Sequence, residues 1–142
     1  MFQRIRDGSF KRLIRVLQTI ATIVTSVNTL TSDFLIWDSD CAFCARCVGF
    51  IERRVKTEAK IVAHQKADLL QLGLTTEQCN AALQWVFRDS TIRSGSRAVA
   101  ALLRSSNFGW AILGVAIDLP VVRLISSAIY KVIAKNRQHL PG

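Results

Sequence analysis

Three cysteines lie within seven residues, and two of them form a Cys-x-x-Cys pair directly after an apolar run. The apolar segment Phe34–Trp37 is followed by Asp38 and then by Cys41 and Cys44. A thiol at the N-terminus of a helix lies among free backbone N–H groups at the positive end of the helix dipole, which favours the thiolate. We therefore predict that Cys41 and Cys44 are a redox-active pair. Cys41 is the expected attacking thiolate, because a cap position is expected to be more exposed, and Cys44 is the expected resolving thiol.

Asp38 is the third residue to which we assign a chemical role. Its carboxylate could take a proton from Cys44 through a water molecule, as a general base. A hydrogen bond that caps the helix or closes the turn explains an aspartate at this position equally well. Asp38 and Asp40 would also oppose a thiolate at Cys41 by repulsion between like charges, which Arg46 could offset.

The remaining cysteines leave a second interpretation open. Cys47 follows Cys44 by three residues in the same expected helix, too far for an unstrained disulfide, and its expected role is core packing. Cys79 is explained as a buried free cysteine. In the alternative, Cys41, Cys44 and Cys47, together with Cys79 or His64, bind zinc or an iron–sulfur cluster. The preferred interpretation includes no metal and no bound cofactor.

The segments around these cysteines predict a small α/β domain. The expected elements, in chain order, are a strand at 34–37, a helix at 42–56, a strand at 60–64, short helices at 66–72 and from Thr75, a β-hairpin at 83–93, and helices at 97–105, 108–117 and 121–136. Thr75 and Gln78 have the spacing of a capping box, and Ser96 is the expected cap of the helix at 97–105. A right-handed crossover would make the first two strands parallel. The order βαβ then ββα is expected of a thioredoxin-like mixed sheet, with extra C-terminal helices.

Three motifs in this order resemble the DCC family of thiol-disulfide oxidoreductases. They are Asp38-x-x-Cys41-x-x-Cys44 after a strand, Gly95-Ser96-Arg97-Ala98 opening a helix, and Tyr130-Lys131-Val132-Ile133-Ala134-Lys135-Asn136-Arg137. The resemblance covers about residues 34–138 and implies a thioredoxin-like fold with a redox role. Ser39 stands where the family usually has glycine. Pro120 and Pro141 are the only prolines, and neither precedes a strand as the cis-proline of thioredoxins does, so the hairpin or the turn at 94–96 would line the site instead.

Length and composition favour one domain with an N-terminal extension. The chain has 142 residues, of which 50% are hydrophobic, and it contains no run of about 18 consecutive apolar residues that would span a membrane. We divide it into a basic amphipathic extension, residues 1–32, and a thioredoxin-like domain, residues 33–142. The extension fits a transit peptide, a weak secretory signal or a helix on a membrane surface, and equally an extra helix packed on the domain.

Charge and cysteine usage restrict the partners. The formal charge of +9 permits nucleic acid or an anionic membrane. No nucleic-acid-reading motif occurs among the basic residues, so no nucleic-acid partner is expected, and the C-terminal helices are expected to cover the sheet rather than a membrane. The clustered cysteines indicate a reducing compartment. We expect a cytoplasmic protein, with an organellar or membrane-peripheral location through residues 1–32 left open.

The preferred function is thiol–disulfide exchange with a protein or a low-molecular-weight thiol. The alternatives from other classes are the metal-binding module and a basic protein associated with a membrane surface, and peripheral membrane contact is left open for the preferred function too. The sequence leaves the oligomeric state open.

Overall fold

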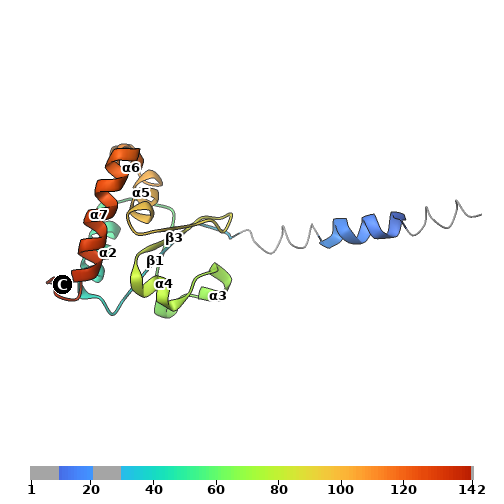
Figure 1. Cartoon of the computed structure of the whole chain (residues 1–142), viewed down its shortest axis with the longest axis horizontal. Coiled ribbons are helices and arrows are strands. Elements are labelled where there is room, and N and C mark those ends of the chain that lie inside the picture. Colours follow the sequence, from blue (N-terminus) through green and yellow to red (C-terminus); the bar gives the residue numbers. More distant parts are fainter. Residues whose placement is uncertain (1–9, 21–29, 142) are drawn as a thin grey trace, which may run out of the picture.

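A computed structural model describes residues 10–20 and 30–141 of the chain (Figure 1). Residues 10–20 are helical, and their side chains are exposed. The helix predicted for the N-terminal extension is therefore present over this stretch, and its continuation to residue 27 lies outside the described residues.

A four-stranded mixed sheet forms the centre of the domain. Its strands are β1 (Phe34–Trp37), β2 (Lys60–Ala63), β3 (Gln84–Val86) and β4 (Ile92–Ser94), in the order β2-β1-β3-β4. β1 and β2 are parallel, while β3 is antiparallel to both β1 and β4. The predicted parallel first pair and the predicted hairpin are confirmed. The second strand ends one residue earlier than predicted, because His64 begins the short 3₁₀ helix η1 (His64–Lys66).

Helices connect and follow the strands. They are α2 (Ala42–Arg54), α3 (Leu69–Leu72), α4 (Thr76–Ala81), α5 (Ser96–Arg104), α6 (Phe108–Asp118) and α7 (Pro120–Asn136). Local signals decide several boundaries. Both hydrogen bonds of the predicted capping box between Thr75 and Gln78 are present, and Gly73, in the left-handed region at φ +69°, ends α3. The predicted Ser96 cap is wrong, because Gly95 is the N-cap at φ +63° and Ser96 is the first residue of α5.

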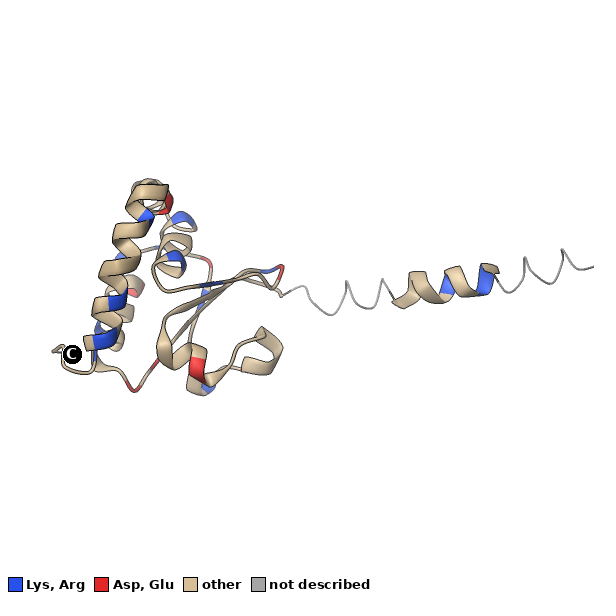
Figure 2. Ribbon diagram, in the orientation of Figure 1, with Lys and Arg blue, Asp and Glu red and all other residues tan. Residues whose placement is uncertain are grey.

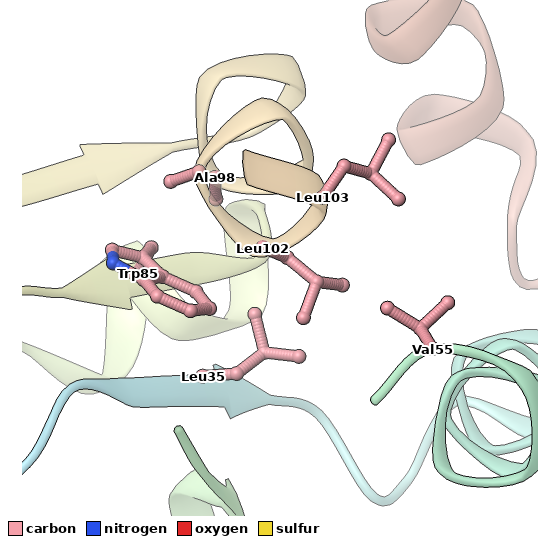
Figure 3. Close-up of a cluster of buried hydrophobic side chains, with 7 residues drawn as sticks. Leu35, Val55, Trp85, Ala98, Leu102 and Leu103 are labelled. Atoms are coloured by element: carbon pink, nitrogen blue, oxygen red, sulfur yellow. The ribbon is translucent and has the colours of Figure 1, made fainter. Parts of the chain in front are cut away.

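Two hydrophobic clusters lie on opposite faces of the sheet, because successive side chains of a strand point to opposite sides. Leu35 and Trp85 face one cluster, which Val55 and residues of α5 complete. Figure 3 shows the buried side chains of this cluster. Ile36 and Val86 face the other cluster, which contains Leu72, Leu74 and Cys79. α5 thus covers one face, and α3 and α4 cover the other (Figure 1).

The expectation that the last two helices cover the sheet is only partly correct. Trp110 and Ile117 of α6 pack against the cluster around Leu35. α5 makes the main helical contact with β3 and β4, while α6 and α7 pack on α5 and on each other. α7 contains no fully buried residue. The outer faces of α6 and α7 are therefore exposed, because α5 already occupies the sheet surface.

Candidate thiol site

Cys41 lies at the N-terminus of α2, as predicted. It is the N-cap residue, with extended backbone angles, and its Sγ accepts a hydrogen bond from the backbone N–H of Cys44 at 3.2 Å. The sulfur therefore takes the place that a serine or aspartate oxygen takes in an ordinary cap. A negative charge on this sulfur would be stabilised by that N–H group and by the helix dipole.

The expectation that Cys41 is the more exposed thiol is wrong. Cys41 is 1% exposed, whereas Cys44 is only partly buried. Distant segments meet near this end of α2: Arg137, just after α7, contacts the Cys44 Sγ and also donates to the carbonyl of Asn80 in α4. No local sequence pattern reports such contacts.

Cys44 carries a strongly perturbed thiol. Burial, the hydrogen bond with Cys41 and the negative charge of Cys41 raise the pKa of Cys44 to about 12, and the guanidinium of Arg137 acts in the opposite direction. Arg137 Nη1 lies 3.7 Å from Cys44 Sγ. Cys44 is consequently protonated near neutral pH.

Asp38 is buried beside the pair, at 5% exposure, and is surrounded by donors. Its Oδ1 accepts hydrogen bonds from the backbone N–H of Asp40 and from Gln65 Nε2, each at 3.0 Å. Its Oδ2 accepts from Arg137 Nη2 at 3.2 Å, and His64 Nε2 lies 3.6 Å from Oδ1. The structural role that the sequence offered for Asp38, a turn hydrogen bond, is present, while the general-base role stays a prediction.

Arg137 is the site residue to which sequence reasoning gave no role. In the sequence it stands out only as the last residue of the third motif. The signal for its function was its place in that motif, but 93 residues separate it from Cys44. Gln65, which approaches Asp38 from η1, was missed for the same reason. His64, which the sequence offered only as a possible metal ligand, also lies beside Asp38.

The other two cysteines differ from each other in burial. Cys79 is buried, as predicted, and both burial and the charge of Asp38 raise its pKa. Cys47 is exposed, so the predicted core role is wrong: Val48 is the buried residue of α2, and Cys47 lies about 100° away around the helix. All four cysteines are free thiols. Within residues 10–20 and 30–141, no three His, Cys, Asp or Glu side chains are grouped as ligands of a metal ion, so no observation supports the metal-binding alternative.

A largely apolar cavity of about 410 Å³ opens beside Cys44 and Cys47. Its aromatic lining consists of Trp37, Phe43, Phe50, Trp110 and Tyr130. Trp37, just before Asp38, and Phe43, between the two cysteines of the pair, thus border the thiol site. Arg46 and Arg137 supply positive charge to the same cavity.

The predicted substitute for a cis-proline loop is only partly correct, because Leu83, at the start of the predicted hairpin, lines this cavity, whereas the turn at 94–96 does not. Residues 94–96 line a neighbouring cavity of about 560 Å³, which shares Tyr130 and Arg137 with the apolar one. Tyr130 connects the two regions, since its hydroxyl accepts the N–H of Leu83 at 2.9 Å and its ring lies against Gly95. The described residues contain no cis peptide bond. Ser39 does not adopt a positive φ, so serine fits where the family usually has glycine.

The fold and this site define the class of protein, a thioredoxin-like α/β domain with a Cys-x-x-Cys pair at a helix N-terminus. A protein-family model described as DCC1-like thiol-disulfide oxidoreductase matches residues 35–142. The chain therefore belongs to the DCC1-like thiol-disulfide oxidoreductase family, and the resemblance based on three motifs is confirmed. No curated protein and no solved structure matched the chain.

Proposed function

We propose that this protein exchanges disulfides through Cys41 and Cys44 with a thiol partner that carries an apolar group. The observation that carries the proposal is the arrangement of the pair. Cys41 Sγ accepts the Cys44 N–H at the start of α2, and Cys44 borders the apolar cavity. One sulfur is thus placed to hold negative charge, and the other to meet a partner.

The burial of Cys41 supports a division of roles different from the one expected from sequence. An incoming sulfur can reach Cys44 from the cavity, whereas Cys41 is covered. We therefore assign first contact with the partner to Cys44. Cys41 is the thiolate that leaves, or attacks, within the protein.

The exchange step is written for the oxidised protein and a dithiol partner. A partner thiolate attacks Cys44 Sγ, a new sulfur–sulfur bond forms, the Cys41–Cys44 bond breaks, and Cys41 Sγ takes the electron pair. The partner's second thiolate then attacks its own sulfur in the mixed disulfide. Cys44 leaves and takes up a proton, as its pKa of about 12 requires near neutral pH. The protein has gained two electrons, and the partner has lost two.

Two charged side chains support these steps. Arg137 Nη1, 3.7 Å from Cys44 Sγ, stabilises the charge that develops as Cys44 leaves the mixed disulfide. Asp38 holds that guanidinium in place through its Oδ2. Proton transfer between Asp38 and Cys44 remains the prediction made from sequence.

The cavity supports an apolar partner, such as a cysteine flanked by aromatic residues in a peptide or an unfolded protein. Aromatic rings dominate its lining, and burial of an apolar side chain there is favourable by about 25 cal/mol per Å² of surface removed from water. We expect a cystine peptide with phenylalanine beside its cysteine to react faster than the glycine analogue or glutathione disulfide.

The first experiment is an anaerobic thiol titration of the full chain in graded glutathione redox buffers, with disulfides mapped by mass spectrometry. Two thiols should be lost in one reversible step and should map to Cys41 and Cys44. Cys41→Ser and Cys44→Ser should abolish this step, while Cys47→Ser is the matched control and should retain it. Equal losses in all three variants, or a disulfide that involves Cys47 or Cys79, would contradict the proposal.

The assignment of roles has its own test, which is trapping of the mixed disulfide. The Cys41→Ser protein, which retains Cys44, should accumulate a mixed disulfide with the phenylalanine-containing peptide, because no second thiol resolves it. The Cys44→Ser protein should accumulate much less. The reverse pattern would restore Cys41 as the partner-facing sulfur.

A further inference from the structure

The outer surface of α6 and α7 is apolar and exposed. Leu124 is 73% exposed and Val132 is 62% exposed on α7. The other large apolar side chains exposed on these two helices are Phe108, Ile112, Leu113, Val115, Val121, Val122, Ile125, Ile129 and Ile133. Soluble monomers rarely expose so much contiguous apolar surface unless it binds something.

The charges on this surface have one sign. α7 carries Arg123, Lys131 and Lys135 and no acidic residue, as the blue segments of the helix in Figure 2 show. The acidic residue of α6, Asp118, is already paired with Arg93 and Arg104 at 3.2 and 2.8 Å. The unpartnered surface is therefore apolar with cations beside it.

Helical geometry places the lysines at the edge of the apolar stripe. At about 100° per residue, Val121, Ile125 and Val132 lie within roughly 40° of one another around α7. Lys131 and Lys135 lie along one border of that stripe, and Tyr130 lies on the opposite, inward side. An apolar stripe bordered by lysines is the pattern of a helix that lies in a membrane interface.

Neither helix is suited to crossing a membrane. Among the described residues, no single helix is both long and apolar enough to span; α6 and α7 pass that criterion only as a pair, and they are bent by 93°. α6 has 11 residues and α7 has 17, about 16 Å and about 26 Å at 1.5 Å per residue, both shorter than a hydrocarbon core of about 30 Å. This geometry suits helices that lie on a bilayer.

We propose that the α6–α7 surface docks onto an anionic lipid bilayer. Charge decides among the possible occupants. A second copy of the chain carries the same charge of +9, and the helical stretch 10–20 carries Lys11, Arg12 and Arg15 and no acid, so both are repelled. Nucleic acid matches the charge but offers no apolar surface to the stripe. Anionic lipid offers both headgroup charge and acyl chains.

Docking would bring the thiol site close to the lipid. Ile133, Ala134 and Tyr130 of α7 also line the apolar cavity beside Cys44. The cavity would therefore lie behind the docked stripe, at a distance of about one helix diameter, or about 10 Å. The docking proposal itself does not depend on the exchange reaction, and it is tested without it.

The test is cosedimentation of the full chain with phosphatidylcholine vesicles, with and without phosphatidylglycerol. We expect binding to the anionic vesicles and weakening of that binding by salt. The double variant Ile125→Ser/Val132→Ser should weaken binding about tenfold or more, because it removes two apolar anchors. Lys131→Gln/Lys135→Gln should weaken it about thirtyfold, because two cations near the surface contribute about 1 kcal/mol each.

The matched control is Leu70→Ser/Lys66→Gln, which removes an exposed leucine on α3 and an exposed lysine on η1. It should bind as the unchanged protein does, and circular dichroism should show all variants folded. Three results would overturn the proposal. The first is that the protein does not bind anionic vesicles. The second is that Leu13→Ser/Leu17→Ser loses binding while the α7 variants keep it. The third is that the protein forms a dimer in the absence of lipid and that the α7 variants dissociate this dimer.

Discussion

Arg137 joins two groups of the thiol site through one side chain. Its Nη2 donates to the buried Asp38 carboxylate, and its Nη1 donates to Cys44 Sγ. The guanidinium can do both because its donors lie in a fixed planar fork. Arg137 therefore links the stability of the domain with the ionisation of its thiols.

Replacing Arg137 by glutamine should change both properties. The variant leaves Asp38 as a buried carboxylate without its cation, and loss of one partner from such a pair costs about 3 kcal/mol or more. The pKa of Cys44 should rise further, because Arg137 lowers it in the unchanged protein. Urea denaturation and the pH dependence of Cys44 alkylation measure the two effects.

Lys135→Gln is the matched control for this variant. It removes an exposed cation two residues earlier, and a surface change of this kind shifts stability by about 0.5 kcal/mol or less. Equal destabilisation in the two variants would mean that the Asp38–Arg137 pair contributes nothing particular to the fold.

The Cys41→Ala variant should lower the pKa of Cys44. Burial is the largest cause of the raised value and persists in the variant, but the hydrogen bond with Cys41 and its negative charge are lost. The rate of Cys44 alkylation should then increase at a lower pH than in the unchanged protein. An unaltered profile would mean that the two thiols do not interact.

At the scale of the elements, the crossing of α5 and α6 depends on Gly114. A Cβ at this position would lie 2.7 Å from the backbone N of Arg104 and 2.8 Å from the carbonyl oxygen of Ala100. Real Cβ atoms do not approach backbone atoms so closely. Glycine therefore permits the close packing that places α6, and with it Trp110, against the cavity.

Gly114→Ala should destabilise the protein by about 1–3 kcal/mol, the usual cost of overpacking a close contact. Gly109→Ala, in the same helix, is the matched control, because a Cβ there meets nothing within 4 Å. It should be neutral or stabilising by up to about 1 kcal/mol, since alanine is the better helix former. Thermal unfolding of both variants measures the difference in stability. Similar shifts in melting temperature would mean that the close contact at Gly114 does not limit the packing of α6 on α5.

At the scale of the whole molecule, the raised thiol pKa values predict loss of stability in alkali. Cys44 has an ordinary pKa of 9.0 and a value of about 12 in the folded protein. Between these values the unfolded chain releases a proton that the folded chain keeps, so the free energy of unfolding falls as pH rises from about 9 to about 12. Cys47, Cys79 and Tyr130 act in the same direction, because their pKa values are raised too.

Urea denaturation at a series of pH values checks this prediction. Ionisation of Cys44 should not change the urea midpoint below pH 9, and it should lower the midpoint above pH 9. The Cys44→Ser protein should show a smaller fall, because serine does not ionise in this range. A midpoint that falls equally in both proteins would assign the effect to the other groups.

Much of the fold was predictable from sequence, because local physics decides it. The apolar run Phe34–Trp37, the Thr75–Gln78 capping box and the left-handed Gly73 each act within a few residues. The same is true of the Cys41 cap, since a Cys-x-x-Cys pair after a strand needs only the first turn of the next helix. The motifs also predicted the family.

What only the tertiary structure decided was which side chains are covered and which distant residues meet. The burial of Cys41, the exposure of Cys47 and the ion pair between Asp38 and Arg137 depend on contacts across the chain, the last of them over 99 residues. The exposed face of α7 belongs here too. Its apolar period predicts a helix with one apolar side, but whether the sheet or the solvent receives that side depends on α5, which already covers the sheet. Periodicity and spacing are local, whereas burial is a property of the packed molecule.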